Sequence, residues 1–385
     1  MTTEETIVVR AAVLTDAPGG LAIEELELDT RLEPDEVRVR VLACGLCHSD
    51  LHMLDGTLPT TMPTVLGHEI AGVVEAVGSA VTDLAVGARV VACLSMFCGT
   101  CAACRAGRPW ICVRRHDLGR AERPRPRLRR ADGTPVGQVA GLGGLAEATV
   151  LHRTSVVEVA ADVPADRAGL LGCAVITGVG SAINGAQVRP GETVAVIGVG
   201  GVGLNVVQGA RLAGAARIVA VDVAPAKLDL ARTFGATDVV DASAGDPVAA
   251  VTALVGPVDH AFDVVGRSTT VAQAVAMIAP GRTAWVVGIP PVGEELALPG
   301  LPLVTQAKGV QGLLMGANRF TEDIPMLADL YTQGRLELDA LISDRLTLEE
   351  TAAGFEAMRA GALARAVVVF DAATTAATDE NGGAA

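Results

Sequence analysis

The sequence is poor in aromatic residues. Phe, Trp and Tyr make up 2% of the 385 residues, whereas apolar residues make up half of the chain and glycine contributes 44 positions. We therefore expect sheets and helices packed through Ala, Val and Leu, with many tight turns between them. A chain of this length exceeds one ordinary hydrophobic core and predicts two domains.

The chain also lacks an excess of basic residues. Its 30 Lys and Arg stand against 44 Asp and Glu, which gives a net charge of -14. Nucleic acids and anionic membrane surfaces attract proteins through a positive field, so neither is an expected partner. Small molecules are the expected partners instead.

Long uninterrupted apolar runs are missing as well. Gly, charged or turn residues break the apolar stretches before they reach the length that spans a bilayer, and residues 1–6 are polar and acidic, unlike a secretory signal. Four of the eight cysteines lie between Cys98 and Cys112. Such bunching favours metal ligation over a disulfide framework, so we predict a cytoplasmic protein.

The pattern of apolar residues changes along the chain. Residues 1–174 contain short β-branched segments such as EVRVRVLACG and GARVVACLSM, which predict a mainly β domain. Residues 175–313 alternate strands and helices, with strands expected at 193–198 and 217–223 and helices at 201–213 and 226–234. This alternation predicts a doubly wound parallel sheet and an α/β fold class. We expect residues 314–371 to return to the first domain and residues 372–385 to form a disordered tail.

A cluster of four cysteines predicts a structural metal site. Cys98, Cys101, Cys104 and Cys112 have the spacing C-x2-C-x2-C-x7-C, which lets four thiolates surround one tetrahedral zinc ion from a single lobe at about residues 95–115. A four-iron, four-sulfur cluster is the alternative, although its fourth cysteine usually lies elsewhere and precedes Pro.

A second set of polar residues predicts a catalytic metal site. CGLCHSDLH contains Cys47, Ser49, Asp50 and His52, GHE contains His68 and Glu69, and LLGCAVITG contains Cys173. Cys47, His68 and Cys173 form a Cys, His, Cys set that leaves the fourth position of a zinc ion open, as catalysis requires.

The open position predicts the chemistry of this site. An alcohol bound to zinc loses its proton near neutral pH, which makes hydride departure feasible. Ser49 and His52 have the groups and the spacing for a proton relay to solvent. Asp50 and Glu69 suit the surroundings of the metal, where carboxylates orient the ligands.

A glycine motif predicts a dinucleotide site. Gly198, Gly200 and Gly203 follow the strand TVAVIG and open a helix, so the turn is tight and its backbone, including Gly201, can approach a pyrophosphate at the helix N-terminus. Asp222 ends the next strand, where its carboxylate would accept the ribose hydroxyls and repel a 2′-phosphate. We therefore predict NAD as the cofactor, with Lys227 assisting at the ribose.

From about residue 8 to residue 370 the chain resembles the zinc-containing medium-chain alcohol dehydrogenases, in the liver-type or formaldehyde-oxidising branch, in motif order and spacing. The resemblance implies a GroES-like catalytic domain and a Rossmann domain, with two zinc ions and NAD. It implies that Cys47, His68 and Cys173 bind the catalytic zinc and that the other four clustered cysteines bind the structural zinc. It further implies that Ser49 and His52 relay a proton through the cofactor ribose.

The resemblance also implies cofactor contacts that spacing alone does not predict. His48 and Arg365 are expected at the pyrophosphate, Arg267 near the cofactor, and Thr177 and Val202 beside the nicotinamide. Members of the family are commonly homodimers or homotetramers, and we expect one of the two here.

The substrate class stays open at this point. The resemblance implies six substrate-lining positions, and the residues there are all aliphatic, which favours an alcohol bulkier than ethanol; they are Leu58, Leu94, Val139, Ala140, Ile289 and Leu314. The Arg-rich loop at 114–130 is expected to be solvated, or to recruit an anionic substrate, a thiol adduct or an acidic partner. Two alternatives to an alcohol dehydrogenase are oxidation of a thiol adduct of formaldehyde and a non-catalytic nucleotide-binding regulator.

Overall fold

The computed structural model describes residues 5–118, 126–361 and 364–370, and it divides into two compact units. Unit 1 comprises Met1–Cys173 and Arg319–Ala385, and unit 2 comprises Ala174–Asn318. The chain leaves unit 2 after Asn318, whereas the sequence pattern placed that boundary at residue 313. The tail at 372–385 lies outside the described residues.

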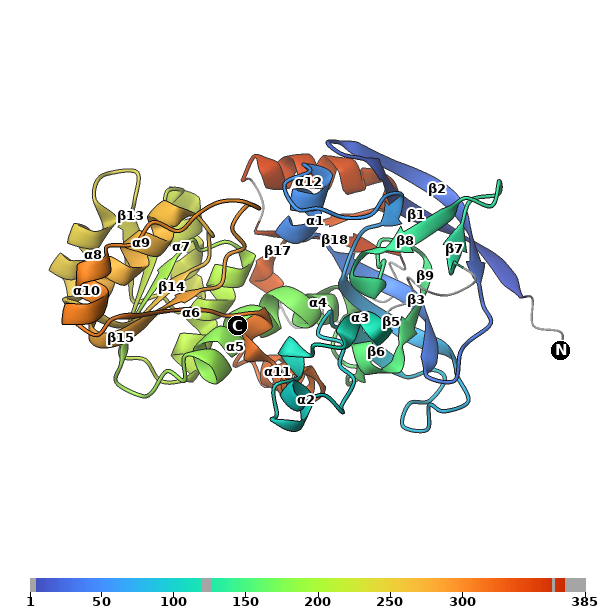
Figure 1. Ribbon diagram of the computed structural model, residues 1–385, viewed down its shortest axis with the longest axis horizontal. Helices are drawn as coiled ribbons and strands as arrows, with labels where there is room; N and C mark the ends of the chain where they lie inside the picture. Colours follow the sequence, from blue (N-terminus) through green and yellow to red (C-terminus); the bar gives the residue numbers. More distant parts are fainter. Residues whose placement is uncertain (1–4, 119–125, 362–363, 371–385) are drawn as a thin grey trace, which may run out of the picture. The chain divides into compact units, whose positions relative to one another are not determined.

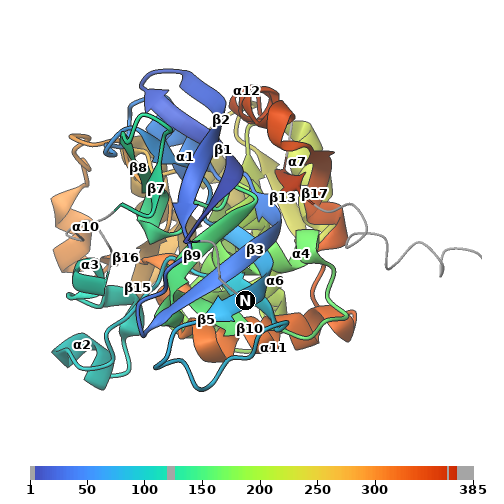
Figure 2. The same ribbon diagram turned by 90° about the vertical axis from the view of Figure 1, so that its right-hand side faces the viewer.

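Unit 1 contains a small closed barrel. Its strands follow the order β1-β2-β7-β8-β4, and Figure 2 shows the long β1 and β2 hairpin with β7 and β8 beside it. The strands are β1 (Thr6–Asp16), β2 (Gly20–Asp29), β4 (Thr64–Val65), β7 (Leu128–Arg129) and β8 (Pro135–Gln138). Alternate residues of β1, including Val9, Ala11 and Val13, point into the barrel core, as the period of two predicts.

A second sheet of unit 1 holds the candidate site. Its order is β10-β6-β5-β3-β18-β17, and β9 pairs with β3. The strands are β3 (Glu36–Gly45), β5 (Glu69–Val77), β6 (Arg89–Ala92), β9 (Ala148–His152), β10 (Val156–Glu158), β17 (Ile342–Leu346) and β18 (Arg365–Val369). Strand β18 pairs with β3 although more than 300 residues separate them, so the mainly β domain is discontinuous in sequence.

Short helices complete unit 1. They are α1 (His48–Leu54), α2 (Ala102–Arg105), η1 (Pro109–Ile111), α3 (Arg115–Leu118), η2 (Val139–Gly141), η3 (Arg153–Ser155), α4 (Ala165–Leu170), α11 (Phe320–Thr332), η7 (Asp339–Leu341), η8 (Leu348–Glu350) and α12 (Thr351–Arg359). Helix α4 packs against β3 and β5, which carry candidate metal ligands at their ends.

Unit 2 is a doubly wound α/β domain (Figure 1). Its six parallel strands have the order β13-β12-β11-β14-β15-β16, which is the strand order of a dinucleotide-binding sheet. The strands are β11 (Thr193–Ile197), β12 (Arg217–Asp222), β13 (Asp238–Asp241), β14 (Val258–Asp263), β15 (Ile278–Val286) and β16 (Gly309–Gly312). The helices are α5 (Ile176–Gly180), α6 (Gly201–Leu212), α7 (Pro225–Thr233), α8 (Pro247–Val255), α9 (Ser268–Met277) and α10 (Gly300–Thr305), with the turns η5 (Ser181–Gly185) and η6 (Met315–Ala317).

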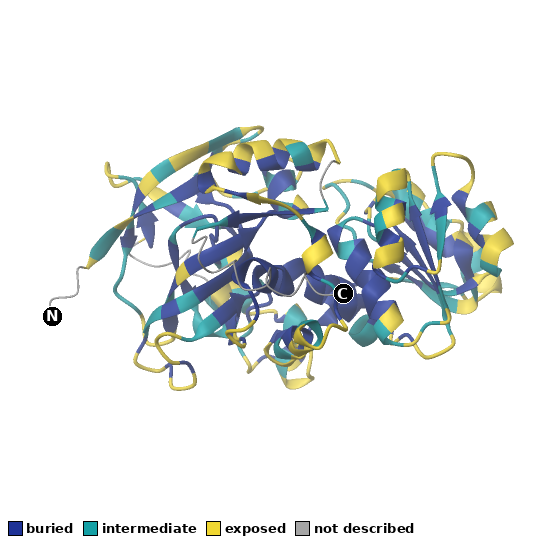
Figure 3. Ribbon diagram, turned by 180° about the vertical axis from the view of Figure 1, so that it is seen from behind, coloured by how far each residue is buried: buried dark blue, intermediate teal, exposed yellow. Residues whose placement is uncertain are grey.

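The central strands of this sheet consist of consecutive apolar residues because helices cover both faces of the sheet. Val194, Ala195, Val196, Val219 and Ala220 are fully buried, and Figure 3 shows the strands as buried and the outer turns of the helices as exposed. A parallel sheet buried on both faces needs no alternation of polar and apolar residues.

One helical stretch is long and apolar enough to span a bilayer, whereas the sequence pattern predicted that no apolar stretch reaches that length. Residues Ala165–Gly185 form 21 helical residues with a mean hydropathy of 1.4, enough to cross a membrane by length and composition. However, 83% of its most apolar 18-residue segment is buried within the protein, as in the core helix of a folded domain. The stretch includes a π-helical turn at Leu171–Val175, labelled η4.

Candidate functional site

The pairing register of β3 brings the first candidate ligands together. The last residue of β3, Gly45, lies opposite Glu69 on β5 and opposite Val367 on β18. Cys47 follows β3 by two residues and precedes helix α1, and His68 directly precedes β5. Because strands locked in register fix the positions of adjacent residues, Cys47 and His68 lie side by side.

Cys173 reaches the same place from the π-helical turn that follows α4. The ligand atoms of Cys47, His68, Glu69 and Cys173 all lie within 4.8 Å of one another, and all four residues are buried. His68 Nε2 and both carboxylate oxygens of Glu69 are buried without a hydrogen-bond partner. A buried polar atom without a partner is costly, and a bound metal ion would satisfy His68 Nε2, while the Arg365 guanidinium lies beside the Glu69 carboxylate.

Asp50 orients the imidazole of His68. Its carboxylate lies 3.2–3.3 Å from His68 Nδ1 and accepts a hydrogen bond of 3.0 Å from the Gly67 N–H. Nδ1 is therefore engaged, and Nε2 is the nitrogen left for a metal. Such a carboxylate-imidazole pair is common around zinc.

Glu69 and Arg365 form a buried ion pair beside the ligands. Arg365 Nη1 lies 3.3 Å from Glu69 Oε1 and donates a hydrogen bond of 3.0 Å to the Leu46 carbonyl. Burial raises the pKa of Glu69 to about 8, although the Arg365 charge opposes the shift. A side chain at Gly45 would place its Cβ 2.2 Å from Glu69 Oε2, so this glycine makes room for the carboxylate.

The two thiols and the imidazole shift one another's pKa values. The hydrogen bond with Cys173 lowers the pKa of Cys47 and raises the pKa of Cys173. Burial alone would disfavour imidazolium, but the charges of Asp50 and Cys47 outweigh it and raise the pKa of His68. This donor set has the composition that zinc prefers, two sulfurs and one nitrogen, and so fits a catalytic zinc.

The structure places the predicted relay residues on helix α1. Ser49 Oγ lies 3.8 Å from Cys47 Sγ, and His52 Nδ1 lies 3.2 Å from Thr57 Oγ1. Within the described residues, no hydrogen bond joins Ser49 to His52. His48 is exposed at the start of the same helix.

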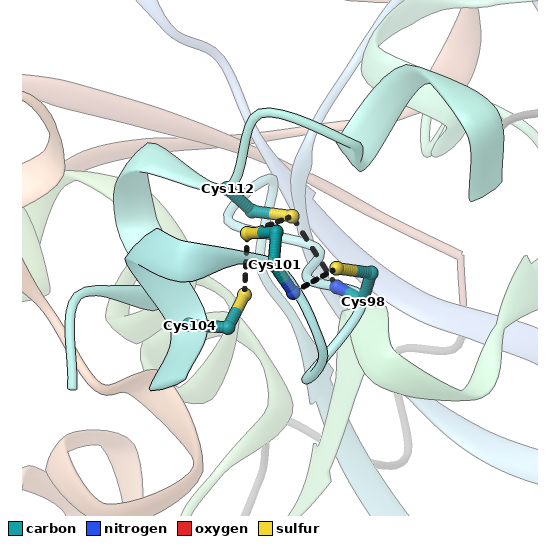
Figure 4. Close-up of side chains that lie close together, drawn as sticks. All are labelled: Cys98, Cys101, Cys104 and Cys112. Carbon is teal, nitrogen blue, oxygen red and sulfur yellow. Dashed lines mark hydrogen bonds between the residues drawn. The ribbon is translucent and has the colours of Figure 1, made fainter. Parts of the chain in front are cut away.

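The four clustered cysteines converge in a small lobe (Figure 4). Their sulfurs lie within 4.8 Å of one another, with distances of 3.5 Å from Cys101 to Cys104 and 3.9 Å from Cys101 to Cys112. Zn–S bonds of about 2.3 Å place tetrahedral sulfurs about 3.8 Å apart, so the cluster fits one zinc ion. In an iron-sulfur cluster each thiolate binds a different iron and the sulfurs must spread further, so the geometry disfavours that alternative.

Backbone N–H groups donate hydrogen bonds to the cysteine sulfurs of this lobe. The Cys101 N–H donates to Cys98 Sγ at 3.3 Å, and the Cys98 N–H donates to Cys112 Sγ at 3.3 Å. Hydrogen bonds, above all from Thr100, lower the pKa of Cys98 to about 6, whereas burial raises that of Cys104 to about 12. The lobe core contains little besides Cys101, Ala103 and Cys112.

The glycine-rich turn of unit 2 has the shape of a phosphate-binding turn. Gly198 has φ +87°, and a Cβ at Gly203 would lie 1.9 Å from the Gly198 carbonyl oxygen. In contrast, a Cβ at Gly200 would meet nothing within 4 Å. Helix α6 begins at Gly201, so this open space lies at a helix N-terminus, where a pyrophosphate fits. Val202 is half-buried in the first turn of α6.

Asp222 lies at the end of β12 and is fixed by two backbone amides. Its carboxylate accepts hydrogen bonds of 2.9 Å from the Val199 N–H and 3.0 Å from the Ala224 N–H. The side chain therefore adjoins the glycine-rich turn. Lys227 is half-buried on α7.

The remaining predicted cofactor residues have other neighbours in the structure. Arg267 Nη1 forms an ion pair of 3.1 Å with Glu294, which also accepts the Ser268 N–H at 2.7 Å. Thr177 is buried on α5, and its hydroxyl donates to Met315 Sδ at 3.5 Å. Nothing in the sequence pattern signals Glu294 or Met315, because both lie outside recognisable motifs.

The structure also locates the cysteines and aliphatic residues discussed above. Cys44 and Cys93 are fully buried, and burial raises the pKa of Cys93 to about 11, so both behave as small apolar residues. Among the expected substrate-lining residues, Val139 is buried, whereas Ile289 and Leu314 are 48% and 45% exposed. Residues 119–125 of the Arg-rich loop lie outside the described residues.

Fold and site together define a zinc-dependent dehydrogenase with a dinucleotide-binding domain. Comparison with known families agrees: residues 33–161 match the alcohol dehydrogenase GroES-like domain, and residues 201–330 match the zinc-binding dehydrogenase domain. The chain belongs to the zinc-containing medium-chain alcohol dehydrogenase family.

Three relatives illustrate this membership. The class-3 alcohol dehydrogenase of Cereibacter sphaeroides is 36% identical over 375 residues, covering 94% of this chain and 99% of the relative. An alcohol dehydrogenase zinc-binding domain protein from Burkholderia ambifaria is 33% identical with a TM-score of 0.90, and covers 95% of this chain and 100% of its own. The benzyl alcohol dehydrogenase of Acinetobacter calcoaceticus is 30% identical with a TM-score of 0.87 and the same coverage.

These findings confirm the predicted fold class and the general activity. The protein is an oxidoreductase acting on alcohols or aldehydes, and it uses zinc and a nicotinamide dinucleotide. The comparisons therefore support an enzyme rather than a non-catalytic regulator.

Proposed function

We propose that the protein reversibly transfers a hydride between a primary alcohol and NAD, giving an aldehyde, with one catalytic and one structural zinc per chain. The observation that carries the proposal is the buried Cys47, His68 and Cys173 set, whose ligand atoms converge within 4.8 Å. Zinc held by these residues would supply the Lewis acidity that makes the alcohol proton acidic.

The surrounding residues have separate roles in this proposal. Asp50 holds His68 with Nε2 toward the metal, and Arg365 offsets the charge of Glu69 in a buried setting. Ser49 receives the proton of the alcohol at Oγ, and His52 passes it to solvent. His48, Arg267 and Arg365 are proposed to approach the cofactor, and Thr177 and Val202 to lie near its nicotinamide.

The dinucleotide is proposed to be NAD. The open space at Gly200 accommodates a pyrophosphate, with the Gly198, Gly201 and Gly203 backbone around it. The Asp222 carboxylate, fixed by two amides, is in position to accept ribose hydroxyls, and its charge would repel a 2′-phosphate. Lys227 is proposed to assist there.

The substrate is proposed to be bulkier than ethanol, such as an aromatic or medium-chain primary alcohol. The lining residues expected for it are aliphatic, and Ser49 has no methyl group beside the metal. A solved relative that is named a benzyl alcohol dehydrogenase supports an aromatic substrate. Each additional buried methylene contributes about 0.8 kcal/mol, so three or four raise kcat/KM by roughly a hundredfold.

A substrate series tests this proposal. We expect kcat/KM, followed by NADH absorbance, to rise from ethanol through hexanol to benzyl alcohol and geraniol. L94F should shift the preference back toward ethanol, while L254F, at an exposed position of α8, should leave the series unchanged. A steady fall of kcat/KM with substrate size would contradict a wide pocket.

A second candidate function is oxidation of an S-hydroxymethyl thiol adduct of formaldehyde. The Cereibacter sphaeroides relative is named a class-3 alcohol dehydrogenase, and this name supports the second candidate function. The same assay with formaldehyde, with and without a low-molecular-weight thiol, separates the two functions, because only the second depends on the thiol.

The proposed setting of the enzyme is the cytoplasm, and its proposed assembly is a homodimer or homotetramer. No nucleic acid or membrane partner is proposed, since the net charge is -14. Sedimentation equilibrium of the zinc-loaded protein decides between dimer and tetramer.

A further inference from the structure

The end of helix α1 brings a threonine against the imidazole of His52. Asp55 caps the helix, and Gly56 follows with φ +73°. The Gly56 N–H donates to the Met53 carbonyl at 3.1 Å, and the Thr57 N–H donates to the His52 carbonyl at 2.9 Å. These two bonds form a Schellman motif, which folds the sixth residue back onto the first.

In this motif the two residues usually make an apolar contact, but here the contact is polar. Thr57 Oγ1 lies 3.1 Å from the His52 carbonyl oxygen and 3.2 Å from His52 Nδ1. The hydroxyl thus meets two groups of the same residue. Thr57 is exposed and His52 is half-buried.

The hydroxyl has one proton, and its 3.1 Å distance to the His52 carbonyl oxygen, which also accepts the Thr57 and Leu58 N–H groups, favours one direction for the two hydrogen bonds. A carbonyl oxygen can only accept, so the Thr57 O–H donates to it. The hydroxyl oxygen then accepts from the imidazole, which requires the proton of neutral His52 to lie on Nδ1. The opposite tautomer would turn the hydroxyl toward Nδ1 and leave two oxygens facing each other without a proton.

We propose that Thr57 is a positioning residue that holds neutral His52 with its proton on Nδ1, leaving the lone pair of Nε2 to accept the substrate proton. The Nδ1–H bond to Thr57 persists when Nε2 is protonated, so the ring keeps its orientation while the proton enters and leaves at Nε2. This inference rests on the relay role of His52 in the proposed function.

The charged groups near this part of α1 have partners of their own. Asp55 pairs with Arg359 of α12, the helix packed against α1, and Arg359 also pairs with Glu356. Asp50, on the buried side of α1, binds His68. The Thr57 hydroxyl is therefore the group that meets His52 Nδ1 in the described part of the chain.

Ring nitrogen NMR of the full-length, zinc-loaded protein tests the tautomer directly. With 15N-labelled histidine, long-range 1H–15N correlations at a pH where the ring is neutral should show His52 with its proton on Nδ1, and H52Q assigns the signal. T57V removes the hydroxyl at nearly constant shape and should lower the ratio of the Nδ1–H to the Nε2–H form by roughly fivefold. T57S keeps the hydroxyl and should resemble the wild type.

Kinetics show whether Thr57 acts through His52. In T57V, kcat for alcohol oxidation at low pH should fall several-fold with KM nearly unchanged, T57S should restore it, and the double variant T57V/H52Q should equal H52Q alone. A wild-type ring with its proton on Nε2, or a T57V spectrum identical to wild type, overturns the proposal. The expected spectra together with an unchanged pH profile in H52Q would instead refute the relay in the proposed function, and Thr57 would lose its positioning role with it.

Discussion

Substitution of a single cysteine should have different effects in the two metal centres. Cys173 lies in a helix buried within a large core, so C173S should lose one zinc per chain and nearly all turnover while the fold persists. Cys101 lies in a lobe with almost no core of its own, so C101S should lose the other zinc and destabilise the lobe.

Elemental analysis, turnover and limited trypsin digestion measure these effects. The lobe carries exposed Arg105, Arg108 and Arg114, which become cleavable when it unfolds. C93S serves as the control, because Cys93 is a buried cysteine that belongs to neither ligand cluster. Equal zinc loss and equal protease sensitivity in C173S and C101S would contradict the assignment of two distinct sites.

Asp222 should decide between the two nicotinamide dinucleotides. D222A removes the carboxylate that would bind the ribose hydroxyls, so kcat/KM with NAD should fall by about 10- to 100-fold, as expected for hydrogen bonds to a charged group. In contrast, kcat/KM with NADP should rise, because the repulsion of the 2′-phosphate is removed. D241A is a matched control, since Asp241 ends the neighbouring strand β13 in a similar turn. A wild-type enzyme that prefers NADP would refute the role of Asp222.

Some site residues follow from the sequence and others do not. The spacing of Cys98, Cys101, Cys104 and Cys112 is sufficient, because four ligands within fifteen residues can close around one ion without help from the fold. Arg365 is different, since it meets Glu69 only through the pairing of β18 with β3. The Gly56 that precedes Thr57 is consistent with the end of a helix, but a single glycine in a polar stretch is equally consistent with a turn or a loop. The contact between Thr57 and His52 could therefore not be predicted from the sequence.

At the scale of an element, the glycine-rich turn offers a matched pair of substitutions. G203A should destabilise unit 2, because the added methyl would lie 1.9 Å from the Gly198 carbonyl oxygen. G200A should leave the thermal transition nearly unchanged, since nothing lies within 4 Å, yet weaken NAD binding by occupying the cofactor space. Differential scanning calorimetry and titration calorimetry measure both. Full NAD affinity in G200A would show that the pyrophosphate lies elsewhere.

Elements with strong periodicity were predicted close to their observed bounds. The strand expected at 193–198 is β11 (Thr193–Ile197), and the helix expected at 201–213 is α6 (Gly201–Leu212). Strands β7 and β4 have two residues each, too short for any period to show, and their pairing is fixed by barrel closure. The return of the chain was placed at residue 314, after the last expected strand, whereas the second part of unit 1 begins at Arg319, after the short turn η6 that follows β16.

At the scale of the whole molecule, NAD should stabilise the protein by mass action. Cofactor at about 100 times its Kd contributes roughly 2.7 kcal/mol to the free energy of unfolding, which raises the transition of unit 2 by several degrees. NADP at the same concentration should do less, because Asp222 opposes its phosphate. Thermal scans with each dinucleotide measure the difference, and G200A, which lacks the effect, is the control. Equal stabilisation by both would contradict the proposed selectivity.

The π-helical turn at Leu171–Val175 limits how this enzyme can be redesigned. A π-helical turn accommodates one more residue than an α-helical turn, and here the widened turn contains Cys173. Forcing the stretch into a regular α-helix while keeping that extra residue would rotate every later position by about 100°. Cys173 would keep its identity and its burial yet face away from Cys47 and His68. Helix regularisation, a common route to thermostability, would therefore remove a metal ligand without changing a single ligand residue.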